Sequence, residues 1–444
     1  MKRRKASRPT VHDLRFAYEW ERGDGVAAPE LAATWARLEV WVGGRCVTRV
    51  EDAESGSARR SIYCSLYPLA EWIAFNWWLL NSNIRPAAFP ARAGLLSAQH
   101  NIRAAGDGFV WPDLSVLPQG DLTRVVWRSD DGSLASGSPI RYITGGEAFV
   151  AGDAVQVALA GVVESVLARL EEMGIASSSL EEEWQAITDA QPEEIEFCRG
   201  AALLGVDPYS IDSDTASVLA EIAQELDGQL RDDFLGAVDP LQIRADLDWV
   251  AAQHNTIDEI QGEPNARLEF LRKETRLPHR SPAVLPWELG YQQAAEVREI
   301  LGVSLVDRFE LSGLIEYCVR TSQDPAIQGL GGFSRSGSSA LVAGIKSQQR
   351  TDVRFASTRG IWHFAYDVDP HRFLLTGGRA DQPRTERAFA AELLAPASGI
   401  QQLVPEDGGL VAAVDLDQIA EHFDVGPLVV RHQVENRLSL QVVD

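Results

Sequence analysis

Two short stretches near the C-terminus carry the candidate metal-binding and catalytic side chains of this sequence. The first reads RFASTRGIWHF, from Arg354 to Phe364, and the second reads TERAFAAELLAP, from Thr385 to Pro396. Two histidines four positions apart on one helix face bind a single metal ion. The first stretch has a single histidine, His363, and no acidic residue. The sequence therefore poses the question of whether metal-dependent chemistry is possible here.

The order of segments around these stretches resembles the ImmA/IrrE family, whose members carry a zincin-like metallopeptidase domain. The family pattern is approximately RFxxAHExxH, a loop or short hairpin, then ExxANxFAAxLLMP and a helix pair. Here FAAELLAP is a close match, IAEHFDVG matches the turn of the helix pair, and PWELGYQQAAEVREILG looks like the helix that leads into the domain. The resemblance covers residues 285–444 and implies a degenerate zincin-like domain there.

In this family a histidine pair and a third ligand from the next helix hold the metal, and a glutamate activates the metal-bound water. Carried over to this sequence, the first histidine position holds Arg359, the general-base position holds Gly360, and the second histidine position holds His363. The third ligand position holds Pro383, with Glu386 one helical turn later. Thus HExxH is replaced by Arg-Gly-Ile-Trp-His over residues 359–363.

These replacements remove the chemistry of the motif. Arginine stays cationic at any ordinary pH and repels a metal ion, glycine offers no proton acceptor, and one histidine cannot hold a catalytic zinc. We therefore predict no catalytic residue, no metal and no cofactor. Instead, Arg359 and Glu386 should approach each other, directly or through a neighbouring acid, and join the two helices.

An alternative is a rebuilt zinc site. In the same alignment His363, His371 and Glu386 lie near the former pocket, and Asp367 is one turn from His363. Such a site would make the protein an active metal-dependent endopeptidase with relocated ligands.

The resemblance implies a function in regulation. Family members commonly act on repressors and in stress or mobile-element control. We expect a cytoplasmic, non-catalytic pseudo-enzyme whose former substrate groove binds a protein partner, such as a repressor or other regulator, without cutting it.

A DNA-binding role for the C-terminal helix pair is the weakest alternative. The second helix carries basic residues, but acidic residues accompany them in both helices, which favours a packing element. The formal net charge of −23 also argues against nucleic acid, because DNA binding needs cations that neutralise phosphates. The basic residues are Arg431, His432 and Arg437, and the acidic ones are Asp415, Asp417, Glu421 and Glu435.

Composition favours a cytoplasmic globular protein without a membrane segment. The basic start, KRRK, is not followed by an apolar segment, so no secretory signal is predicted. The longest apolar run, Leu69 to Leu80, contains Glu71 and is too short to cross a bilayer. The cysteines form no CxxC pair and are expected to be reduced and mostly buried thiols. They are Cys46, Cys64, Cys198 and Cys318.

The length of 444 residues exceeds one ordinary core, so we predict a multi-domain α+β protein that is mostly helical. Residues 1–150 form a Trp-rich α+β module with a hairpin at Gly43-Gly44, and Trp72, Trp77 and Trp78 should lie in its core. Residues 151–260 form an acidic helical region whose charges read as a solvated face. Residues 261–284 form a connection, and residues 285–444 form the ImmA/IrrE-like domain.

Within this last domain the pattern predicts helices over residues 307–319, 354–364 and 386–396, and a strand over 340–345. Residues 329–340 read as a Gly/Ser-rich loop. Its GFSRSG has the glycine spacing of a phosphate loop, but Ser338 and Ser339 follow where a lysine is needed, so no phosphate site of that type is predicted.

Overall fold

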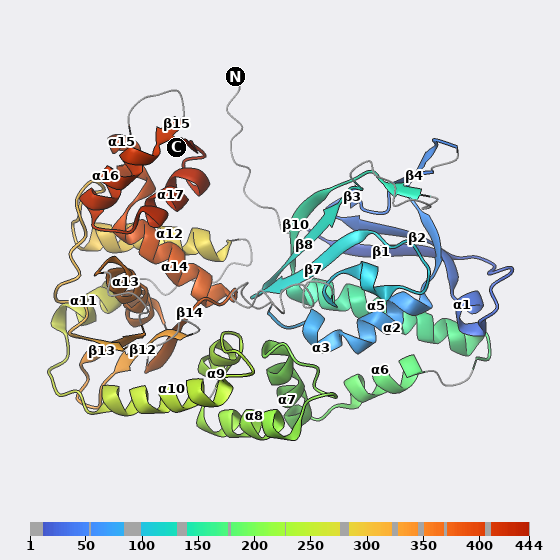
Figure 1. The fold of residues 1–444 in the computed structure, drawn as a ribbon, viewed down its shortest axis with the longest axis horizontal. Helices are drawn as coiled ribbons and strands as arrows, with labels where there is room; N and C mark the ends of the chain where they lie inside the picture. Colours follow the sequence, from blue (N-terminus) through green and yellow to red (C-terminus); the bar gives the residue numbers. More distant parts are fainter. Residues whose placement is uncertain are drawn as a thin grey trace. The chain divides into compact units, whose positions relative to one another are not determined.

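The chain has a mixed α+β fold, as the sequence predicts, and divides into two compact units, Met1–Leu219 and Ala220–Asp444 (Figure 1). The region predicted as acidic and helical, residues 151–260, is shared between them. The computed structural model describes residues 12–52, 55–83, 99–130, 140–175, 179–226, 228–275, 284–321, 327–344, 350–367, 371–404 and 410–443.

Small antiparallel sheets covered by helices build the first unit. The strands are β1 (Leu14–Trp20), β2 (Trp35–Val42), β3 (Arg45–Cys46), β4 (Val50–Asp52), β5 (Ala58–Arg59), β6 (Ile62–Ser65), β7 (Asp113–Gln119), β8 (Leu122–Arg128), β9 (Ile140–Tyr142) and β10 (Gly146–Ala151). The helices are α1 (Pro29–Ala33), α2 (Tyr67–Phe75), α3 (Trp77–Leu80), α5 (Gly152–Glu172), α6 (Ser179–Asp189) and α7 (Pro192–Leu203), with α8 (Ser213–Glu225) at the boundary and a 3-10 turn at Ile102–Ala105.

Alternation of apolar residues places one face of each long strand in the core. In β2 every second residue is buried, and β1 and β6 pair with this strand on its two sides. The predicted hairpin is confirmed, because Gly43 and Gly44 both adopt positive φ and connect β2 to β3. Helix α5 packs on β1, β8 and β10.

The tryptophan-rich segment forms two consecutive helices, α2 and α3. Asn76 separates α2 from α3, and its side chain donates a hydrogen bond to the Trp72 carbonyl. The predicted burial of Trp72, Trp77 and Trp78 is confirmed, since each is 9% exposed or less. Trp77 packs edge-on against Trp184 of α6, with ring centroids 4.9 Å apart.

The second unit combines one four-stranded sheet with a helical layer. Its elements are α9 (Gly228–Leu235), α10 (Ile243–Asp258), α11 (Ala266–Glu274), α12 (Pro286–Ile300), β11 (Tyr317–Thr321), β12 (Ile327–Phe333), β13 (Ser339–Gly344), α13 (Arg350–Tyr366), β14 (Arg372–Thr376), α14 (Asp381–Leu394), α15 (Ala397–Leu403), β15 (Leu410–Ala412), α16 (Ala413–Phe423), α17 (Pro427–Asn436) and β16 (Gln441–Val443). The main sheet has the order β11-β13-β12-β14, and β15 pairs with β16.

Several predictions for this unit are confirmed and two are wrong. The helices α12, α13 and α14 and the strand β13 lie where the sequence predicts them, and α14 ends just before Pro396. The helix predicted over residues 307–319 is instead a series of turns followed by β11, and the loop predicted over 329–340 contains most of β12. The polar connection predicted over 261–284 contains α11.

Glycine in β12 has a packing reason. Gly331 pairs with Phe373 of β14, and a Cβ at Gly331 would overlap the Phe373 ring. Glycine at this position therefore lets a neighbouring aromatic ring approach the backbone of the strand closely. A glycine-rich composition is typical of a loop, but here it reflects a side chain that approaches the backbone of a strand closely.

Helix α12 lies along α14, as the yellow and orange-red ribbons show in Figure 1. A Cβ at Gly290 would overlap the backbone of α14 at Thr385, so glycine permits this close contact. The C-terminal pair, α16 and α17, packs its apolar residues with Leu394 at the end of α14, which agrees with the predicted packing role. No helix in the described ranges is long and apolar enough to cross a bilayer.

Candidate functional site

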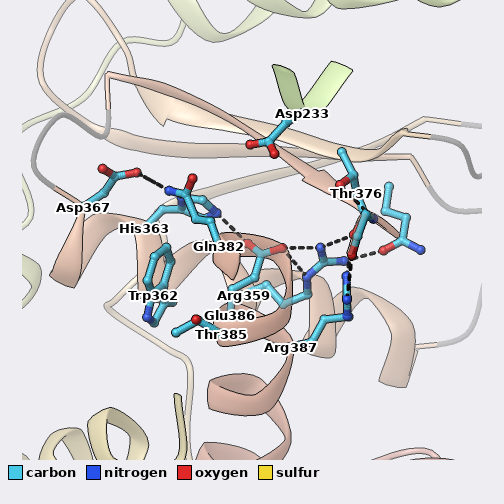
Figure 2. Close-up of polar contacts among 12 residues, drawn as sticks. Asp233, Arg359, Trp362, His363, Asp367, Thr376, Gln382, Thr385, Glu386 and Arg387 are labelled. Atoms are coloured by element: carbon cyan, nitrogen blue, oxygen red, sulfur yellow. Dashed lines mark hydrogen bonds and ion pairs between the residues drawn. The ribbon is translucent and has the colours of Figure 1, made fainter. Parts of the chain in front are cut away.

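The residues singled out in the sequence meet between two helices. Helix α13 presents Arg359 and His363, four residues apart and therefore on one face, toward α14. Helix α14 presents Glu386 toward both of them (Figure 2). All three side chains are buried, with at most 2% of any of them exposed.

Glu386 is the centre of this network. Its Oε1 accepts hydrogen bonds from Arg359 Nε at 3.1 Å and from Arg359 Nη2. Its Oε2 lies 2.5 Å from His363 Nε2. The predicted approach of Arg359 and Glu386 is therefore confirmed and is direct.

The Arg359 guanidinium also binds the sheet, which the sequence did not predict. Its Nη1 donates to the side-chain oxygen of Gln328 in β12, and its Nη2 donates to the Thr376 carbonyl at the end of β14, at 2.7 Å. Arg387 donates to the same carbonyl at 3.1 Å and to the Gly378 carbonyl at 2.8 Å. Gln328 was missed because its strand reads as a loop.

His363 is held on its other side by Asp367 and by an aromatic ring. The Nδ1 atom lies 3.3 Å from Asp367 Oδ2, which accepts a hydrogen bond from Gln382 at 2.9 Å. The Phe373 ring stacks on the imidazole with centroids 4.0 Å apart. These contacts fix the ring and engage both of its nitrogens.

Charges within the network favour the ionised forms of both partners. Burial lowers the pKa of His363, but the carboxylates of Glu386 and Asp367 outweigh it, so its pKa is raised. Burial raises the pKa of Glu386, but Arg359 and His363 outweigh it, so its pKa is lowered. Both shifts favour an imidazolium next to a carboxylate over the pair of neutral groups.

A second carboxyl lies close to the network. Asp233, on α9, appears above the Glu386–His363 pair in Figure 2. Burial and the charge of Glu386 raise the pKa of Asp233 to about 7, and Gln229 donates a hydrogen bond to it at 3.0 Å. Sequence reasoning missed Asp233, because it lies in the acidic helices that were interpreted as a solvated face.

The remaining predicted positions lie outside the network. The space beside Gly360 is filled by Ile315 and Leu341, and Pro383 is buried in the first turn of α14 beside Gly378. His371 is exposed ahead of β14. The alternative site built from His363, His371 and Glu386 is therefore not assembled.

A zinc ion does not fit these side chains. Both oxygens of Glu386 are engaged, and the arginine beside them would repel a metal cation. In the part of the chain that the structure describes, no group of three or more His, Cys, Asp or Glu side chains is arranged to hold a metal. We therefore derive no metal-dependent step.

The network can hold charge but is poorly placed to react. A general acid or base must come within hydrogen-bond reach of the substrate. The Glu386–His363 pair is buried, and each group is paired with the other and with a further side chain. Its chemistry is that of a structural ion network which ties α13, α14 and the sheet together.

No model of a known protein family matches the chain, and no curated protein sequence matches it either.

Proposed function

We propose that this protein is a non-catalytic regulatory or interaction protein of the ImmA/IrrE type, acting in the cytoplasm. In this proposal residues 285–444 are a degenerate zincin-like domain that binds a protein partner, such as a repressor, without cleaving it. The order α12, sheet, α13, β14, α14 and the helix pair α16–α17 supports the resemblance, because the family segments follow one another in this order.

The observation that carries the proposal is the Arg359–Glu386 pair. In an active relative, the space between these two helices would hold a metal cation and its water. Here the guanidinium supplies the positive charge, its donors are taken by Glu386, Gln328 and a backbone carbonyl, and the imidazole is fixed by two carboxylates. Such a closed network supports a binding or scaffold role over hydrolysis.

Metal content tests the loss of catalysis. Protein purified without chelators should contain no stoichiometric zinc by elemental analysis, and added zinc should not induce cleavage of an unstructured protein such as casein. One tightly held zinc per chain that disappears in His363→Ala would overturn the pseudo-enzyme proposal and support the relocated-ligand endopeptidase.

The proposed binding role can be tested by asking whether a bound partner protein stays intact. A repressor-type protein that copurifies with this chain should be recovered at full length after prolonged incubation, as judged by intact-mass measurement. Specific fragments that form with wild-type protein and not with His363→Ala would indicate an active peptidase instead.

A further inference from the structure

Three arginines converge on one carboxylate at the start of α13. Arg308 Nη2 and Arg350 Nη2 donate to Asp424 Oδ2 at 2.5 and 2.6 Å, and Arg354 Nε lies 3.7 Å from the same oxygen. Asp424 ends α16 in the left-handed conformation, with φ of 55°, so its side chain is directed by a fixed backbone. We call these four residues the Asp424 cluster.

The Asp424 cluster carries more positive than negative charge. Among the described residues, Glu310 adds a second carboxylate: its Oε1 lies 3.3 Å from Arg308 Nε, and its side chain is largely exposed. The first turn of α13 adds the positive end of a helix dipole, and it also carries one acidic residue, Asp352. Three guanidinium groups on one carboxylate nevertheless stand out in a chain whose formal net charge is −23.

The three arginines of the Asp424 cluster differ in how much of each side chain is exposed to solvent. Arg354 is 7% exposed; its Nη2 donates to the Phe309 carbonyl, and its Nε has no hydrogen-bond acceptor in the described ranges. Arg308 is 35% exposed and Arg350 is 67% exposed, so both guanidinium groups reach solvent. Burial and the charge of Arg308 lower the pKa of Arg354, since Asp424 offsets them only in part.

We propose that Arg308, Arg350 and Arg354 form a binding site for a phosphate-type dianion, either free phosphate or a phosphate monoester. Guanidinium groups are planar forks that match the oxygens of phosphate in bidentate pairs. A bound phosphate would place negative charge beside the three guanidinium groups and offer acceptors to the donors that Asp424 leaves over. Asp424 is then the internal carboxylate that occupies part of the site and competes with the ligand.

Calorimetric titration of the full chain with sodium phosphate, at pH 7.5 and fixed ionic strength, tests the site. We expect saturable binding of one phosphate per chain. Arg350→Gln should weaken it by about tenfold or more, because the exposed guanidinium is lost while the fold is retained. Arg244→Gln is the matched control, since Arg244 is an exposed arginine in a single ion pair with Glu221, and it should bind phosphate as the wild type does.

Asp424→Asn adds a sharper test, because removing the competing carboxylate should tighten phosphate binding. Absence of saturable binding to the wild type, or equal loss in Arg350→Gln and Arg244→Gln, would overturn the proposal. A phosphoserine peptide serves as the second ligand. Binding about tenfold tighter than inorganic phosphate assigns the site to a phosphorylated chain, and equal or weaker binding assigns it to phosphate or a small ester.

Discussion

The two units bury different kinds of side chain. In the described part of residues 1–219 the buried residues are mostly apolar, and His100 is the one His, Asp, Glu, Lys or Arg among them. In the described part of residues 220–444 the interior also holds many charged groups. They are Asp233, Asp246, Arg298, Arg354, Arg359, His363, Glu386 and Glu392.

This difference has an energetic meaning. Apolar side chains are stabilised by leaving water whatever their particular neighbours, provided that the packing is good. A buried charge is tolerated only when a specific partner and hydrogen bonds offset its desolvation. The first unit should therefore respond to loss of volume, and the second unit to loss of particular partners.

Two buried histidines show the contrast in one residue type. Burial lowers the pKa of His100 to about 4, and the hydrogen bond of its ring to the Val116 backbone, which raises the pKa, does not offset the effect of burial. His363 is more deeply buried, yet its pKa is raised because the carboxylates of Glu386 and Asp367 face it. His100 is thus a neutral core residue, whereas His363 is part of an ion network.

The largest effect should follow from breaking the network at one partner. Arg359→Ala leaves Glu386 and His363 buried without the guanidinium and should destabilise the second unit by about 3–5 kcal/mol. Urea unfolding followed by circular dichroism measures this change, and Arg244→Ala, which removes an exposed arginine, should cost less than about 1 kcal/mol. Arg384 is a poor control, since its guanidinium stacks on Trp287 at 4.5 Å.

The paired change separates charge from volume. Arg359→Leu together with Glu386→Leu should cost clearly less than the sum of the two single changes, because no carboxylate or guanidinium is stranded. Strictly additive effects would show that these two groups do not depend on each other, which contradicts the geometry.

An effect of similar or slightly smaller size should follow from loss of volume in the first unit. Trp77→Ala removes a large side chain that packs against Trp184, and we expect a cost near the lower end of about 3–5 kcal/mol, since 8% of Trp77 is exposed. Differential scanning calorimetry should show a lower melting temperature at every pH from 5 to 8. A pH-dependent loss would indicate a charged environment that the structure does not place there.

The stability of the second unit should depend on pH more strongly than that of the first unit, and it should fall as the pH rises from about 4 toward 7. The pKa of Asp233 is raised to about 7 in the folded state, so the unfolded chain ionises first and stability falls as pH rises from about 4 toward 7. His363 adds to this, because its raised pKa stabilises the fold below its ordinary pKa and this contribution is lost at higher pH. Glu386, with a lowered pKa, loses its contribution only in acid.

Asp233→Asn isolates this effect. The variant should be more stable than the wild type by up to about 4 kcal/mol at pH 8, and the difference should shrink as the pH approaches 4. The melting temperature of both proteins across this range is the measurement. A variant that is less stable than the wild type at pH 8 would show that the Asp233 carboxylate is stabilising and would remove this argument.

Local sequence patterns predicted the part of the network that lies on α13 and α14. They did not predict the partners that come from distant segments of the chain. Helical spacing and Pro396 predicted α13 and α14, and the alignment of their motifs brought Arg359 and Glu386 together. Gln328 and Asp233 were missed, since neither lies in a segment whose pattern points to this site. The glycines of β12 misled the strand prediction, because a Cβ at Gly331 would overlap the Phe373 ring and a Cβ at Gly332 would overlap the His371 carbonyl, and composition cannot reveal such contacts.

The smallest effect on stability should come from Asp367, the partly exposed member of the network. Its replacement should change the pKa of His363 more clearly than it changes the free energy of unfolding. Asp367 is about a quarter exposed, so replacing it by asparagine should cost less than about 1 kcal/mol. The change removes one of the two carboxylates that raise the pKa of His363, and this pKa should therefore fall. Nuclear magnetic resonance of histidine labelled with carbon-13, with His363→Gln for assignment, measures the shift. A pKa of His363 unaffected by Asp367→Asn would mean that Glu386 alone sets it, and the difference between buried and exposed partners would then be sharper than we propose.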